Sequence, residues 1–305
     1  MTIQTHFIKE PLLEFGNGQQ LEHPQDGLFL YGPVSAGGNP EVIHVGVAGT
    51  PEGIALVTTW LTTIIGRIGV EKGDQLHTSS WPGFQPAFGA RLEPKPLVTI
   101  PIPESDISNA IRKTNRTDAV RSTVQLFENA ILEHFRTDDR RPSVWLCVVP
   151  EIVHRYGRPK VGGPKDSTPS TIMSEGAAAP YLQGQTALFP EDADAAQIYL
   201  FARNFHHQLK AQLLHRDVVV QVIRETTLDP SRELDRWGNP IRSVQEPARI
   251  AWNLSTTLYF KGARVQPWQL ANVRPRICYV GLAFKEDPSP AKKGEVCCAA
   301  QMFLN

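Results

Sequence analysis

The chain has 305 residues, of which 41% are hydrophobic and 20% charged, and its formal net charge is zero because 31 Lys and Arg balance 31 Asp and Glu. This composition provides for a substantial hydrophobic core and excludes a disordered or collagen-like chain. No window approaches the roughly 18 uninterrupted apolar residues of a membrane span, and no basic stretch followed by an apolar run opens the chain. The chain has four cysteines, Cys147, Cys278, Cys297 and Cys298. They are too few for a disulfide scaffold. We therefore expect a soluble protein that is neither secreted nor membrane-spanning.

Charge is distributed unevenly along the chain. Residues 1–110 contain 5 basic and 11 acidic residues, whereas residues 201–276 contain 12 basic and 6 acidic residues. The zero net charge argues against a polyanionic partner, but the basic segment does not. Taken alone, such a segment is equally typical of a solvated surface.

Short extended segments joined by turns are expected over residues 11–33, where Gly, Pro, Asn and Asp are dense. Strands and helices then alternate. Apolar runs predict strands at 42–47, 97–102, 144–149 and 218–223, and helical periodicity predicts helices at 52–68, 119–135, 198–214 and 248–260. Loops are expected at 81–90 and 235–240, an irregular insertion at 157–195, and a last pair of strands at 277–284 and 295–303. This alternation indicates an α/β fold with a mainly parallel sheet.

The common enzyme motifs are absent, since the sequence contains no G-x-x-x-x-G-K-[ST], no G-x-S-x-G and no H-E-x-x-H. Gly46, Gly49 and Gly53 lie between a predicted strand and a predicted helix, but their spacing differs from the dinucleotide-binding fingerprint. Tight turning and close packing of the helix on the strand are the favoured roles for these glycines.

Several hydrogen-bond donors are concentrated in the basic segment. His206 and Lys210 are four residues apart on a predicted helix and so share a face, Gln221 follows in the next strand, and Lys261 ends the following helix. Convergence of these four residues, the anchor group, at one end of the sheet would suit a phosphate. Lys supplies charge, while His, Gln and the amides of a helix start supply directed hydrogen bonds. A solvated helix face and a strand-capping glutamine are the open alternatives.

The order of these features resembles the MID domain of Argonaute proteins. The segment from Val144 to Lys261 follows the order strand, long loop, H-x-x-x-K helix, Gln strand and Lys helix, and the anchor group matches the positions that hold the 5′-phosphate of the guide strand. The stretches IKEPLLEFGNG, DGLFLYGP, VGVAGTPEGI, WPGFQPAFG, CYVGLAFK and VCCAAQMFL resemble the short prokaryotic Argonautes, which consist of MID and PIWI domains. The resemblance implies a lead-in segment over residues 1–110, a Rossmann-like MID domain over 111–270, and the first strands of an RNase H-like PIWI domain over 271–305.

One departure from the family concerns catalysis. Catalytic PIWI domains carry an Asp on their first strand, because two divalent ions need carboxylate ligands. Here Ala283 stands at or next to that position, so the resemblance implies a protein that is not itself an enzyme. Glu286 and Asp287 lie nearby, in a Lys- and Pro-containing loop that is typical of a solvated turn.

The second departure is length. The sequence stops at Asn305, just after what resembles the second PIWI strand, and we therefore expect a fragment of a longer protein. The resemblance implies Mg²⁺ at the guide 5′-phosphate, where the family's C-terminal carboxylate helps to bind it. Asn305 cannot be assumed to fill that role.

Further guide contacts are expected around the anchor group. Arg224 and Thr226 or Thr227 follow the Gln strand, and Arg264 follows the Lys261 helix. By resemblance, Tyr156 is the candidate for stacking on the first guide base. Four basic residues follow the 144–149 strand, namely His154, Arg155, Arg158 and Lys160. They are equally consistent with a loop that faces a phosphate and with a solvated turn.

The resemblance implies a guide-binding, non-slicing protein of the bacterial cytoplasm. It would bind a 5′-phosphorylated small guide RNA, pair it with single-stranded DNA of an invading plasmid or phage, and activate an associated effector in antiviral defence by abortive infection. In this family the effector carries an APAZ region fused to a TIR or sirtuin-type NADase, and the two chains form a heterodimer or, on activation, a higher oligomer.

Two other hypotheses stay open. One is an active RNase H-like nuclease whose carboxylates lie beyond residue 305 or in the 284–287 loop. The other is a nucleotide or sugar-phosphate enzyme on a Rossmann-like sheet, if the match of the anchor group is accidental.

Overall fold

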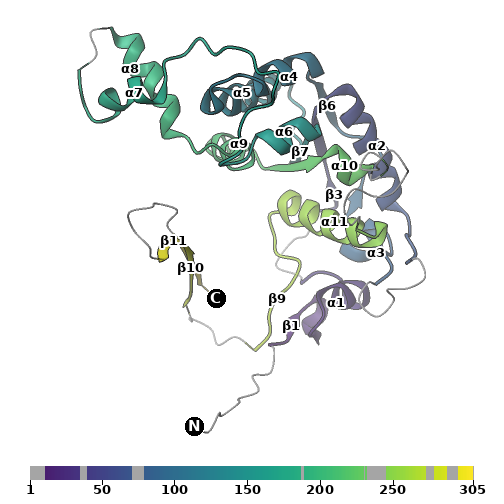
Figure 1. Cartoon of the computed structure of the whole chain (residues 1–305). Helices are drawn as coiled ribbons and strands as arrows, with labels where there is room; N and C mark the ends of the chain where they lie inside the picture. Colours follow the sequence, from purple (N-terminus) through teal and green to yellow (C-terminus); the bar gives the residue numbers. More distant parts are fainter. Residues whose placement is uncertain are drawn as a thin grey trace, which may run out of the picture.

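A computed structural model of the chain describes residues 11–34, 40–70, 79–186, 189–229, 231, 245–272, 278–286 and 295–304. Its centre is a four-stranded parallel sheet in the order β6-β4-β7-β8 (Figure 1). The strands are β4 (Val45–Gly49), β6 (Val98–Pro101), β7 (Val144–Val149) and β8 (Val220–Arg224). The predicted α/β fold with a parallel sheet is confirmed.

Strand β7 is buried on both faces, and its alternating side chains divide the core in two. Val144, Leu146 and Val148 join one hydrophobic cluster, and Trp145, Cys147 and Val149 join the other. Successive side chains of a strand point to opposite faces, so a strand covered on both sides is a continuous apolar run. This is why the sequence defined the bounds of this strand correctly.

Helices cover both faces of the sheet. The first cluster packs under α2 (Pro51–Ile65), α3 (Phe84–Phe88) and α11 (Pro247–Ala263). The second packs under α4 (Glu104–Ile111), α5 (Arg116–Thr137), α6 (Glu151–Tyr156) and α9 (Phe205–Leu214). The short helix α10 (Glu225–Leu228) follows β8 directly.

Smaller elements complete the described part of the chain. β1 (Leu13–Glu14) pairs antiparallel with both β2 (Gln20–Leu21) and β9 (Gln269–Leu270), and β3 (Val42–Ile43) pairs parallel with β5 (Arg91–Leu92). The remaining helices are α1 (Pro24–Tyr31), α7 (Glu175–Leu182) and α8 (Pro190–Ala196), with 3₁₀ helices at Gly16–Gly18 and Gln197–Leu200.

Short helices account for most differences from the sequence-based expectations. The loop predicted at 81–90 is wrong, because it contains α3, which buries Phe84, Ala87 and Phe88 between Gly83 (φ 109°) and Gly89 (φ 69°). Five residues are too few to display helical periodicity. The turn-rich segment 11–33 likewise contains α1.

The insertion predicted to be irregular at 157–195 contains α7 and α8. Neither helix was predicted, because both contain proline, which usually indicates a turn. Pro180 lies inside α7, and Pro190 begins α8. The helix predicted at 198–214 begins only at Phe205, after the 3₁₀ turn. The loop predicted at 235–240 lies outside the described residues.

The parallel sheet joins strands from both sides of the boundary expected between residues 110 and 111. β4 and β6 precede that boundary, β7 and β8 follow it, and β4 pairs directly with β7. The lead-in segment therefore supplies half of the sheet that carries the candidate site.

The last two strands, β10 (Cys278–Glu286) and β11 (Glu295–Leu304), form an antiparallel pair. Ala283 lies opposite Ala299, next to a register shift, and Glu286 ends β10 opposite Glu295. Asp287 and Asn305 lie outside the described residues. No described helix is long and apolar enough to cross a membrane.

Candidate functional site

Helix α9 places His206 and Lys210 at the margin of its buried face. Asn204 caps the helix, since its side-chain oxygen accepts a hydrogen bond from the amide of His207 at 3.1 Å. The side chains that bury the helix against the sheet are Phe205, Leu209 and Leu213. His206 and Lys210 each follow one of these residues and are half-buried.

Lys261 and Gln221 are joined directly. Nζ of Lys261 donates to Oε1 of Gln221 and to the carbonyl oxygen of Val220, both at 2.7 Å. Nε2 of Gln221 donates to the carbonyl oxygen of Val222 at 2.9 Å. These bonds link the last turn of α11 to the beginning of β8. Lys261 and Gln221 therefore meet at the beginning of β8, an edge strand of the described parallel sheet.

The charges of the anchor group act on one another. Burial, and then the charges of Lys210, His207 and Lys261, lower the pKa of His206 to about 4. Burial, and then the charge of Lys210, lower the pKa of Lys261 to about 8. Protonation of either group is disfavoured because positive charges are close together in a partly desolvated place. A bound anion would reverse this effect.

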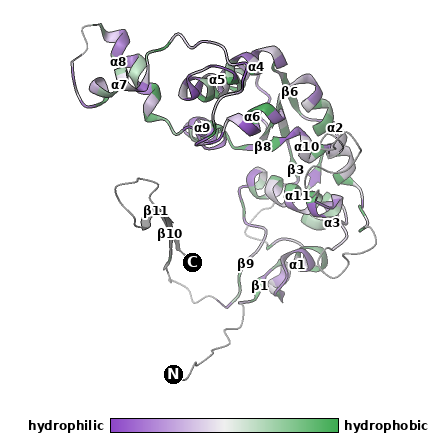
Figure 2. Cartoon of the chain, in the orientation of Figure 1, coloured by the Kyte–Doolittle hydropathy of each residue, from purple (hydrophilic) through white to green (hydrophobic). Residues whose placement is uncertain are grey.

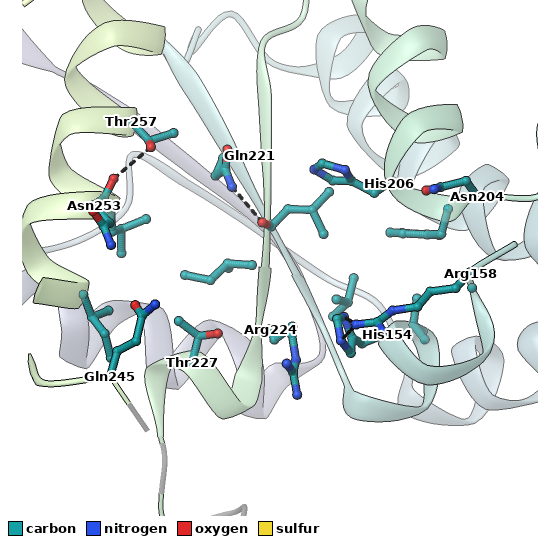
Figure 3. Close-up of a pocket in the computed structure, with 18 of the residues that line it drawn as sticks. His154, Arg158, Asn204, His206, Gln221, Arg224, Thr227, Gln245, Asn253 and Thr257 are labelled. Carbon is teal, nitrogen blue, oxygen red and sulfur yellow. Dashed lines mark hydrogen bonds between the residues drawn. The ribbon is translucent and has the colours of Figure 1, made fainter. Parts of the chain in front are cut away.

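A cavity of about 800 Å³ runs along β8, between α6 and α9 on one side and α11 on the other (Figure 3). His206 and Gln221 line it, with the basic side chains of His154, Arg158 and Arg224. No carboxylate is among its described lining residues, and a wall of this composition suits an anionic ligand. Lys210 and Lys261 do not line the cavity themselves, although Lys261 holds Gln221 on its wall.

The beginning of α9 also lines this cavity, through Asn204, Phe205 and His206. The amide of Phe205 donates to the carbonyl oxygen of Gly157 at 2.8 Å. Among the described residues, the amide of His206 has no hydrogen-bond partner. A free amide at a helix start adds to the positive potential there.

Two of the further candidate contacts lie on the cavity wall, namely Arg224 and Thr227. Nη2 of Arg224 donates to Oε2 of Glu151 at 2.7 Å, which balances part of its charge within the chain. Thr226 is buried outside the lining, and its hydroxyl has no partner within the described ranges.

Tyr156 and Arg264 lie apart from the anchor group. Tyr156 lines a separate hollow, and the guanidinium carbon of Arg116 is 6.0 Å from its ring centre. Arg264 ends α11 in a left-handed conformation (φ 56°) and pairs with Asp217, with 3.1 Å between Nη1 and Oδ1.

Sequence reasoning missed Asn253 and Thr257, which line the cavity from α11. They precede Lys261 at intervals of four residues, so the three side chains form one polar stripe along the helix. That spacing was the available signal.

Gly49 at the end of β4 and Gly53 in α2 pack closely, as predicted. A Cβ at Gly49 would lie 2.6 Å from the carbonyl oxygen of Val148, and one at Gly53 would lie 3.1 Å from Oε1 of Glu225. The N-terminus of α2 is therefore occupied by the side chain of Glu225 and offers no room for a nucleotide phosphate.

Mg²⁺ prefers oxygen ligands, carboxylates above all. No cluster of metal-binding side chains occurs in the part of the chain that the structure describes, and Oε1 of Gln221 already accepts a hydrogen bond from Lys261. Mg²⁺ at the guide 5′-phosphate stays a prediction, and the function proposed below includes no step through it.

No family model and no curated protein matches the chain. Two similar solved structures are each matched over 96% of this chain. They are a crystal structure of Aa-Ago with externally bound siRNA and a structure of Clostridium butyricum Argonaute bound to a guide DNA and a 19-mer target DNA. Their sequence identities are 12% and 13%, and their TM-scores are 0.42 and 0.45. This chain spans 29% of the length of each.

Proposed function

We propose that this chain binds the 5′-phosphorylated end of a small guide RNA, as an Argonaute MID domain does, and presents the guide for pairing with single-stranded target DNA. One observation carries the proposal. His206, Lys210, Gln221 and Lys261 converge beside a cavity without a carboxylate among its described lining residues.

The form of the cavity supports a nucleotide end over a free phosphate ion. At about 800 Å³ it has room for a base and sugar as well as a phosphate. Basic side chains continue from the anchor group along the wall, at Arg158, Lys160 and Arg224. Such a row suits a chain of successive phosphates.

The proposal also includes an effector. With Ala283 on β10, where catalytic relatives carry an Asp, the chain itself would not cleave the target, because a methyl group cannot ligate a metal ion. Target recognition would instead activate an APAZ-containing TIR or sirtuin-type NADase in a cytoplasmic complex. Sequence reading is delegated to base pairing, so the protein needs phosphate contacts more than base-reading side chains.

The test compares two otherwise identical single-stranded RNAs that carry a 5′-phosphate or a 5′-hydroxyl. We expect the phosphorylated RNA to bind roughly 100-fold more tightly, since hydrogen bonds to a charged group contribute about 1.5–3 kcal/mol each. Equal affinities would overturn the proposal. RNA that copurifies with the protein from cells should carry 5′-phosphates.

The alternative of an active nuclease is tested with the full-length protein, a labelled DNA target, a matching guide and Mg²⁺ or Mn²⁺. Any cleavage of the target would refute the proposal that the chain does not slice. The alternative of a nucleotide enzyme on a Rossmann-like sheet loses its usual site, because Glu225 fills the N-terminus of α2.

A further inference from the structure

The amine of Lys261 has only neutral hydrogen-bond partners. Nζ donates to Oε1 of Gln221 and to the carbonyl oxygen of Val220, both at 2.7 Å, and neither its hydrogen bonds nor the charges that act on it involve a described carboxylate. Lysines are mostly exposed to water, or paired with a carboxylate where they are buried. Lys261 is half-buried without such a pair. The function proposed above uses only its charge.

The last turn of α11 places this amine where water is partly excluded. The helix is amphipathic, and Figure 2 shows hydrophobic and hydrophilic residues interspersed along it. One turn before Lys261, on the same side of the helix, lie the buried Leu258 and the half-buried Thr257. Lys261 therefore lies at the margin of the core.

This environment favours the neutral form of the amine. Burial, and then the charge of Lys210, lower the pKa of Lys261 to about 8. At pH 8 about half of such amines are neutral, against about 1 in 250 for a lysine with the ordinary pKa of about 10.4. A neutral amine that donates both of its N–H bonds to Gln221 and Val220 has its lone pair left over. A partly desolvated lysine beside another cation is a typical activated nucleophile.

The adjoining cavity favours one class of electrophile. Gln221 lines the cavity and accepts the bond from Nζ, so one hydrogen bond separates the amine from the wall. Arg158 and Arg224 on that wall, and the start of α9, suit a phosphate group. An acyl phosphate carries its reactive carbonyl carbon on a phosphate oxygen. We propose that Lys261 is a site of acylation by acyl phosphates that bind in this cavity, and that the modification prevents the anchor group from binding a further phosphate.

The acylation step balances without a further reactant. The lone pair of Nζ attacks the carbonyl carbon of the acyl phosphate, the bond from that carbon to the phosphate oxygen breaks, and an amide bond forms. The phosphate leaves as HPO₄²⁻ with the proton that the nitrogen loses. Because the phosphate is the leaving group, the positive charges around the cavity stabilise it as it departs.

Acylation would change two features of the anchor group. The acylated nitrogen is uncharged and carries a single N–H, so it keeps at most one of the bonds to Gln221 and Val220. The site therefore loses a positive charge and part of the support of Gln221 on the cavity wall. The resulting loss of guide binding rests on the proposed function, whereas the acylation itself does not.

The test treats the full chain, without RNA, with acetyl phosphate at pH 8 and follows each lysine by mass spectrometry of its peptides. Lys95 and Lys165, which are exposed outside the site, are the internal references. We expect Lys261 to react at least about tenfold faster than either reference, because a larger fraction of its amine is neutral. The phosphate-free donor N-hydroxysuccinimidyl acetate should show a smaller preference for Lys261. Inorganic phosphate should slow the reaction of Lys261 with acetyl phosphate but not that of Lys95.

Two variants test the cause of the reactivity. Lys210→Met should slow the acetylation of Lys261, because it removes the neighbouring charge that favours the neutral amine. The matched control Lys95→Met should leave the rate at Lys261 unchanged. The proposal is overturned if Lys261 reacts no faster than the references, or if its preference is the same with both acetyl donors.

RNA affinity separates this inference from the proposed function. The chain acetylated at Lys261 should bind 5′-phosphorylated RNA at least about tenfold more weakly, and an unchanged affinity would refute the effect of acylation on the anchor group. If the unmodified chain does not prefer a 5′-phosphate to a 5′-hydroxyl, the proposed function fails instead. The acetylation rates are measured without RNA, so they decide the modification site in either case.

Discussion

Helices α2 and α9 both begin beside the central sheet, but only the N-terminus of α2 is occupied by a carboxylate of the chain itself. At α2, the hydroxyl of Thr50 donates to Oε1 of Glu225 at 2.7 Å and accepts from the amide of Gly53 at 2.9 Å, so a buried carboxylate of the chain itself fills the site. At α9, His206 leaves its amide unpaired within the described ranges and lies among positive charges. Two similar helix ends thus differ because one has an internal anion and the other lacks one.

This difference predicts that an external anion would bind at the start of α9 and not at the start of α2. A helix N-terminus attracts negative charge, and the attraction is already satisfied where Glu225 sits. At α9 the potential is raised further by Lys210 and Lys261. The N-terminus of α2 is thus a filled helix end and that of α9 an open one.

The largest effect is expected from reversing charge at the open end. Lys210→Glu with Lys261→Glu should weaken the binding of 5′-phosphorylated RNA by about 1000-fold, since two positive charges beside the cavity become negative and the bond that holds Gln221 on its wall is lost. Binding is measured by fluorescence anisotropy over a range of salt concentrations, and the slope of log affinity against log salt should decrease.

The matched control for this double variant is Lys95→Glu with Lys165→Glu, which reverses two exposed lysines outside the site. A similar loss in the control would mean that the cluster has no special role. Because Lys261→Glu places a carboxylate near the carbonyl oxygen of Val220, the milder Lys210→Gln with Lys261→Gln serves as a second variant.

At the filled end, Glu225→Ala should lower the free energy of unfolding by about 2–3 kcal/mol, because Thr50 and the start of α2 lose a charged hydrogen-bond partner. Glu225→Gln keeps a hydrogen-bonding oxygen and should cost only about 1 kcal/mol. Urea denaturation measures both. Sulfate should stabilise the Ala variant more than the unmodified chain, and an equal response to sulfate would contradict occupation of this end by Glu225.

The pH dependence of binding should follow Lys261. Its pKa of about 8 means that the ligand-free chain holds this charge at pH 7 and loses most of it by pH 9. The preference for a 5′-phosphate over a 5′-hydroxyl should therefore fall by up to about tenfold, one pKa unit corresponding to about 1.4 kcal/mol. The phosphate stays doubly charged over this range because its second pKa is about 6. The Lys261→Arg variant keeps its charge, so its preference for the 5′-phosphate should depend little on pH. A preference that does not change with pH in the unmodified chain would contradict the lowered pKa of Lys261.

The sequence predicted the elements that packing defines and missed those that local geometry defines. The apolar run of β7 was readable because every residue of the strand is buried, and the amphipathic pattern of α5 because one face of the helix packs on the core. Helix α3 was missed because its five residues are held by two glycines with positive φ, and α7 because Pro180 lies inside it.

Within the site, the spacing of His206 and Lys210 was readable because one helix carries both. The bond between Lys261 and Gln221 was not, because it joins residues 40 positions apart across a packing interface. The same holds for Glu225 at the start of α2, since only the sheet order brings it to Thr50, 175 positions away in the sequence.

The smallest expected effect is on the thermal stability of the ligand-free chain. The charge of Lys210 lowers the pKa of both His206 and Lys261, so Lys210→Met should raise the thermal midpoint at pH 7 by about 2 °C while weakening phosphate binding. The sign follows from linkage. The pKa of Lys261 falls from 10.5 in the unfolded chain to about 8 in the folded chain, so its charge destabilises the fold below pH 8, and this penalty disappears as the pH rises towards 10.5. The gain from Lys210→Met should therefore shrink over that interval. Lys95→Met, at an exposed site, should change the midpoint little at any pH. Inorganic phosphate should stabilise the unmodified chain more than the Lys210 variant, and an equal response would place the anion elsewhere.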